Sequence, residues 1–143
     1  MSQFVEVLSG LIQENGLNAY TLSKKLNLSD TTITRYLNGE RLPTRGTLVK
    51  LADYFNCTTD YLLGLDGEDR ANGFVTAPPF DERIKFLIEK SGLSKRQFCI
   101  KCKISEGSLY CWLQGRGEPY VDALIKLAAF FNSSVDYVIG REK

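Results

Sequence analysis

The feature of this sequence that most constrains its fold is an internal repeat. A shift of 76 positions aligns residues 4–64 with residues 80–140 of the 143-residue chain without a gap. Identical residues recur along the whole alignment and include Leu11/Leu87, Gly16/Gly92, Leu37/Leu113, Gly39/Gly115, Pro43/Pro119, Leu51/Leu127, Phe55/Phe131 and Tyr61/Tyr137. The sequence therefore predicts two copies of one module, in residues 1–64 and 80–143.

Within each copy, apolar residues recur with the period of an α-helix. The first stripe is Phe4, Leu8, Leu11 and Ile12, and its repeat is Phe80, Ile84, Leu87 and Ile88. Capping residues and glycines divide the rest of each module into four further helices. The predicted caps are Asn18 and Ser29 in the first copy and Ser94 and Ser105 in the second, with Gly39 and Gly115 ending the third helices. We expect an all-α protein with five helices in each module.

Residues 65–79 separate the two copies and have a different character. They lack an apolar period, contain acidic residues and glycines, and end in Pro78 and Pro79, which cannot continue a helix. We therefore expect a flexible linker between the modules.

The second and third predicted helices are short and joined by a turn of only a few residues, an arrangement that can place the third helix in a DNA major groove. Residues 17–39, LNAYTLSKKLNLSDTTITRYLNG, followed by Pro43 and the closing DYLLG of residues 60–64, resemble the phage repressor and Cro type of helix-turn-helix, also called the xenobiotic-response-element family. The resemblance covers nearly all of both modules. It implies sequence-specific binding to double-stranded DNA and transcriptional regulation, and we expect a bacterial or phage repressor.

The resemblance makes residues 30–38 the recognition helix of the first module. When Ile33 and Leu37 point inward, the exposed positions suited to base edges are Thr31, Thr34, Arg35 and Asn38. An arginine can donate to both O6 and N7 of a guanine, so Arg35 is the strongest candidate for base reading. The expected phosphate contacts are Lys24, Thr32, Arg41 and Arg45, with Lys95 and Arg96 in the second module.

The second recognition helix, residues 106–114, departs from this pattern. Its exposed positions read Glu106, Gly107, Ser108, Tyr110, Cys111 and Gln114, so Cys111 stands where the first copy has Arg35. Yet residues 80–143 carry 11 basic and 8 acidic residues, against 6 and 6 in residues 1–64. The sequence leaves open whether this module reads DNA or serves as a contact surface.

Composition argues against other functions. The chain has no histidine, and no other group makes a nucleophile–base pair, so we expect neither an enzyme nor a cofactor. Cys99 and Cys102 have metal-ligand spacing, but they align with Ser23 and Leu26 at inward positions, so we expect reduced core thiols and no metal. The exposed position of Cys111 leaves a redox switch as a hypothesis.

The sequence also predicts the location of the protein and its partners other than DNA. The N-terminus has no secretory signal and the apolar runs are short, so we expect a cytoplasmic protein without a membrane partner. No residues remain for a separate sensing domain, and we expect no small-molecule effector.

Two questions of assembly and function remain open at this stage. The fifteen linker residues span at most about 50 Å, and successive major grooves lie about 34 Å apart, so one chain can act as an intramolecular pseudo-dimer. The rival arrangement is a homodimer through the fourth and fifth helices, with Tyr54, Tyr61 and Leu62, or Phe130, Tyr137 and Val138, exposed. The alternative function is a protein-interaction module, such as a phage-derived or antitoxin-like inhibitor, that keeps the fold without reading DNA.

Overall fold

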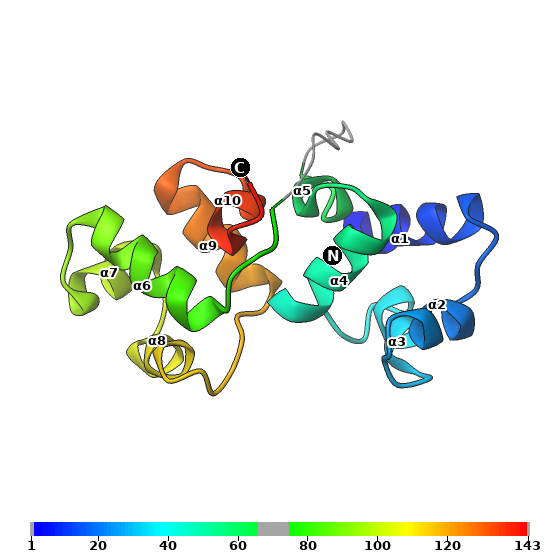
Figure 1. Cartoon of the computed structure of the whole chain (residues 1–143), viewed down its shortest axis with the longest axis horizontal. Coiled ribbons are helices and arrows are strands. Elements are labelled where there is room, and N and C mark those ends of the chain that lie inside the picture. Colours follow the sequence, from blue (N-terminus) through cyan, green and yellow to red (C-terminus); the bar gives the residue numbers. More distant parts are fainter. Residues whose placement is uncertain (1, 66–74, 143) are drawn as a thin grey trace. The chain divides into compact units, whose positions relative to one another are not determined.

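The computed structural model describes residues 2–65 and 75–142, and every helix or strand element assigned in these ranges is an α-helix (Figure 1). This confirms the all-α class. The chain divides into two compact units, Met1–Ala71 and Asn72–Lys143, which we describe separately. None of the helices in the described ranges has the length and apolar character needed to span a membrane.

The described part of the first unit contains helices α1 (Ser2–Glu14), α2 (Ala19–Lys25), α3 (Thr32–Leu37), α4 (Arg45–Phe55) and α5 (Thr59–Leu62). Its core is apolar: α1 packs on α3 and α5, and α4 packs on α5. The fully buried side chains include Phe4, Leu8, Leu22, Ile33, Leu48, Leu51 and Leu62. The helical period of the sequence therefore predicts the main buried residues of α1 to α4, although Leu11 and Leu37 are only half-buried.

The second unit repeats this order with α6 (Phe80–Ser91), α7 (Lys95–Cys102), α8 (Glu106–Leu113), α9 (Val121–Phe131) and α10 (Val135–Ile139). Each unit contains an equivalent aromatic contact, at aligned positions. Phe4 meets Tyr36 edge-on with ring centroids 6.1 Å apart, and Phe80 meets Trp112 in the same way at 5.7 Å. Each contact fixes the third helix of a unit against its first helix.

The helix caps agree with the sequence at three of four predicted positions. Asn18 caps α2, Ser94 caps α7 and Ser105 caps α8, each accepting a hydrogen bond from a backbone N–H three residues on. Ser29 differs: its hydroxyl lies 2.5 Å from that of Thr32, and it does not cap a helix. Helix α3 starts at Thr32 rather than at residue 30, with Thr31 as its N-cap residue.

Glycines end the third helices as expected. Gly39 and Gly115 follow α3 and α8 with φ of +74° and +71°, a left-handed conformation that costs glycine little.

The end of the predicted linker packs on the second unit. Pro79 is the N-cap residue of α6, and the backbone N–H of Val75 donates to the carbonyl of Arg141 with an N···O distance of 2.9 Å. The central linker residues, 66–74, lie outside the described residues. Residues 75–79 are therefore part of the second unit's surface rather than a free tether.

A buried ion pair in the second unit has no signal in the helical pattern. The Arg141 side chain is fully buried, and its Nη1 lies 2.6 Å from Oδ1 of Asp136, which is also buried. The aligned residue in the first unit is Leu65, so the first unit lacks this pair. The pair ties the chain after α10 to the N-terminal end of that helix.

The surface expected for a homodimer is only partly available. Tyr54 is 40% exposed, as expected, but Leu62 and Val138 are fully buried. The prediction that these two side chains are exposed is wrong, because the short helices α5 and α10 turn their apolar residues toward α1 and α4, or α6 and α9.

We predict that Asp136→Asn destabilises the second unit by about 3 kcal/mol, because it leaves a buried guanidinium without its counter-charge. Urea unfolding followed by the fluorescence of Trp112, the single tryptophan of the chain, measures the loss in this unit. The exposed Glu89→Gln variant is the control and should shift the free energy of unfolding by less than about 0.5 kcal/mol. Equal stability of the two variants would show that the ion pair is not a structural anchor.

Candidate nucleic-acid interface

Helices α2 and α3 of the first unit form a helix-turn-helix. They lie side by side in Figure 1 and are joined by a short turn in which Asn27 adopts a left-handed conformation with φ of +56°. Leu22 of α2 and Ile33 and Tyr36 of α3 are buried, and they hold the two helices against the core. The opposite face of α3 is left in solvent.

The structure brings together the predicted base-reading residues on this solvent face. Thr31, Thr34, Arg35 and Asn38 are all exposed, the first at the N-cap and the last at the C-cap of α3. Within α3 itself, which has 6 residues, Thr34 and Arg35 are the exposed ones.

The predicted phosphate contacts of the first unit fall into different environments. Lys24 and Arg41 are exposed, whereas Thr32 is half-buried and bonded to Ser29. Arg45 is the first residue of α4 and is only 7% exposed, so the prediction that it contacts a phosphate from solvent is wrong. An arginine at the start of a helix gives no sequence signal of such burial, and we do not retain Arg45 as a phosphate contact.

Lys24 has two neighbours that the sequence pattern does not predict. Its Nζ lies 3.3 Å from Oδ1 of Asp30 and 5.3 Å from the centre of the Tyr20 ring. Both members of the ion pair are more than half exposed, so the pair is weak and screened by salt. A phosphate can therefore replace Asp30 as the partner of Lys24 at little cost.

The second unit presents a different surface. Lys95 and Arg96 are the first two residues of α7 and are exposed. The predicted recognition positions of α8 are also exposed, but among them only Glu106 is charged, and Tyr110 is 56% exposed. The positive charge of this unit thus lies beside α8 and not on it.

The cysteines are free thiols in two kinds of environment. Cys57, Cys99 and Cys102 are buried, as expected for the latter two, and Cys111 is exposed. Burial raises the pKa of Cys99, with a further contribution from Glu106, and burial together with Cys99 raises the pKa of Cys102 to about 11. Protonated thiols are poor metal ligands. No cluster of three or more potential metal ligands occurs within the part of the chain that the structure describes.

Comparison with known proteins agrees with this geometry. Residues 11–62 match the family model described as helix-turn-helix. The HTH-type transcriptional regulator ImmR of Bacillus subtilis (strain 168) is 35% identical over 60 residues, which are 42% of this chain and 47% of that protein. This chain thus covers less than half the length of that relative. No solved structure gives a significant match.

Residues 11–62 therefore form a helix-turn-helix domain, in agreement with the resemblance to the phage repressor and Cro type. The family match begins within α1 and ends at the last residue of α5, so it covers most of the described first unit.

We predict that iodoacetamide at pH 8 modifies Cys111 first in the folded protein and leaves Cys102 intact. A thiol with a pKa of about 11 is ionised in only about one molecule per thousand at that pH, and burial also blocks access to it. Peptide mass spectrometry after timed quenching measures the two rates. Comparable rates for Cys102 and Cys111 in the folded chain would contradict the environments described here, and equal labelling in urea is the control.

Proposed function

We propose that this chain is a sequence-specific, double-stranded DNA-binding transcriptional regulator that acts as a repressor. The observation that carries the proposal is the solvent face of α3, where Thr31, Thr34, Arg35 and Asn38 are exposed together on a helix-turn-helix domain. The Bacillus subtilis relative is named as a transcriptional regulator, which supports the same proposed function.

The side chains on α3 match the hydrogen-bonding edges of the major groove. Arg35 donates to O6 and N7 of a guanine, and Asn38 pairs with N6 and N7 of an adenine. Thr31 and Thr34 offer a hydroxyl to a base edge or a methyl group to thymine. Lys24 and Arg41, exposed on either side of α3 in the sequence, bind phosphates and fix the register of the helix. Thr32, which is half-buried, has a smaller part in that contact.

We further propose that the two units are tandem modules that bind one DNA molecule. The second unit repeats the helix order of the first, and Lys95 and Arg96 stand exposed at the start of α7, where they meet phosphates. Because α8 has cysteine in place of Arg35, the second unit supplies mainly affinity and little sequence reading. Tethering raises its local concentration to the millimolar range, so even a weak second contact tightens binding.

Arg35→Ala tests the specific contact. We expect it to cost about 1–3 kcal/mol in binding to the preferred duplex and to relax the preference at one base pair. Lys25→Ala is the matched control, since it removes one positive charge from an exposed side chain of α2 and leaves α3 unchanged. Fluorescence anisotropy with the preferred duplex and single-base variants measures both effects. Identical losses for the two variants, without relaxed specificity, would reject base reading by Arg35.

The double variant Lys95→Gln/Arg96→Gln tests the contribution of the second unit. Each phosphate contact contributes about 0.9 to the slope of log K against log salt, so losing both should lower its magnitude by about 2. The preferred sequence should stay the same. Lys101→Gln, at an exposed position later in α7, is the control. A slope that does not change would exclude these two residues as phosphate contacts.

A further inference from the structure

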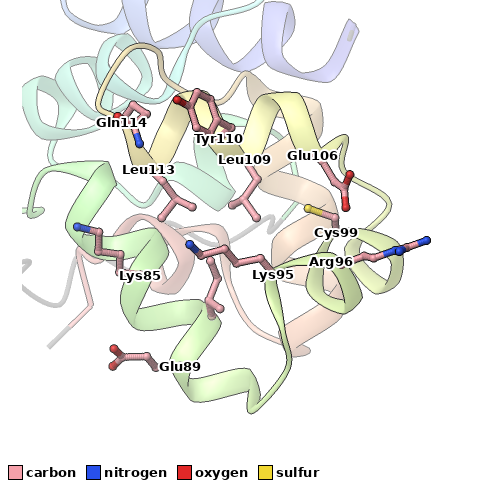
Figure 2. A pocket seen from close by; sticks show the side chains of 11 residues that line it. Lys85, Glu89, Lys95, Arg96, Cys99, Glu106, Leu109, Tyr110, Leu113 and Gln114 are labelled. Carbon is pink, nitrogen blue, oxygen red and sulfur yellow. The ribbon is translucent and has the colours of Figure 1, made fainter.

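A groove in the second unit lies where α6, α7 and α8 meet, and its volume is about 550 Å³ (Figure 2). This volume is in the range of pockets that hold small molecules, roughly 300–1,000 Å³. Its lining comes from all three helices, and the groove opens beside the exposed face of α8. The DNA contacts proposed above do not account for its apolar floor.

The floor of the groove is uncharged and largely apolar. It consists of Ile88 from α6, Cys99 from α7, and Leu109 and Leu113 from α8. In Figure 2, Leu109 and Leu113 point from α8 into the groove. The raised pKa of Cys99 keeps its thiol protonated, so this residue adds no charge to the floor.

Charged side chains form the rim. Lys85, Lys95 and Arg96 supply three positive charges, against the two negative charges of Glu89 and Glu106. Figure 2 shows the Lys95 side chain running across the groove below Leu109 and Leu113, toward the side where Lys85 stands, with Glu106 and Arg96 near the other end. Within the described ranges, neither Lys85 nor Lys95 forms an ion pair.

The internal repeat shows that these cations belong to the second unit alone. The floor positions Ile88, Leu109 and Leu113 align with Ile12, Ile33 and Leu37, so an apolar residue occupies each of them in both units. The three basic rim residues align with uncharged ones: Ser9 for Lys85, Ala19 for Lys95 and Tyr20 for Arg96. Core packing therefore accounts for the floor, but it does not account for the rim.

We propose that this groove is a binding site for a small amphipathic carboxylate, with the apolar body on the floor of Ile88, Leu109 and Leu113 and the carboxylate at Lys95 and Lys85. An ammonium group forms a charge-assisted hydrogen bond to a carboxylate. The half-buried side chains of Ile88 and Leu113 lose their remaining contact with water when an apolar ligand covers them, whereas Leu109 is already buried. A ligand with only one of these two parts uses half of the site.

The position of the site couples it to the surface of α8. Tyr110 and Gln114 line the groove and also belong to the exposed positions of this helix. A bound carboxylate therefore occupies Lys95 and changes the surroundings of Tyr110 at the same time. This coupling to α8 rests on the proposed DNA binding, whereas the carboxylate site itself does not. The proposed site replaces the expectation that the chain has no small-molecule effector.

The test uses the full chain and decanoate as the probe, without DNA, so that its outcome is independent of the proposed function. Backbone amide NMR titration reports where decanoate binds. We expect saturable shifts at Ile88, Leu109 and Leu113, with none at the aligned Ile12, Ile33 and Leu37. Acetate, which has the charge without the apolar body, and decan-1-ol, which has the body without the charge, should each bind at least about tenfold more weakly.

Variants distinguish a specific binding site from nonspecific electrostatic attraction. Lys85→Gln/Lys95→Gln should weaken decanoate binding by about tenfold or more, whereas Lys101→Gln, at an exposed position outside the groove, should leave it unchanged. Wild type and the single variant Lys95→Gln serve as references for folding. Without ligand, both of these and the two variants above should give the same amide dispersion. Absence of saturable shifts, shifts of equal size at the first-unit positions, or equal affinity of the double variant and Lys101→Gln would each overturn the proposal.

Discussion

In each unit, burial of the inner face of one short helix holds in place the surface that the unit exposes to a partner. Helix α3 has 6 residues and α8 has 8, and helices shorter than about 12 residues are marginal on their own in water. Each is held by an inward aliphatic residue, Ile33 or Leu109, and by an edge-on contact between the aromatic residue of its last turn and the phenylalanine of the first helix. The outward side chains can differ between the two units because the inward ones hold the helix in place. That separation is why one scaffold carries two different surfaces in the same chain.

The two copies differ chiefly in where their charge lies. In the first unit the arginine stands on α3 itself, among small polar side chains suited to base edges. In the second unit α8 has Cys111 at the aligned position, and the basic residues stand at the start of α7 and on α6, around a groove with an apolar floor. The floor positions are apolar in both units, so core packing does not explain why the charges are placed differently. We propose that this difference divides the roles, so that one unit reads a sequence and the other adds affinity and responds to a ligand.

Much of the fold could be predicted from the sequence, because the repeat and the helical period both report burial of apolar residues. The caps Asn18, Ser94 and Ser105 were also predictable, since a cap depends on neighbouring residues only. The start of α3 at Thr32 was not predictable in this way, since Ser29 and Ser105 each bond the hydroxyl three residues on, but only Ser105 also caps its helix. Arg45 and Arg141 could not be placed, because burial of a charged residue depends on partners that only the folded chain brings near. The exposed positions of α3 followed from periodicity, whereas the groove required three helices in space and had no signal in any one of them.

Selection from a pool of random DNA duplexes with the full chain tests the central claim most directly, because it asks for specific reading without assuming a site. We predict one asymmetric motif, with a strongly specified half that contains guanine for α3 and a weakly specified half about one helical turn away. Binding of the selected duplex should fall steeply with salt. Failure to enrich any sequence at low salt, with the protein folded, would contradict the account and show that the exposed face of α3 does not read DNA.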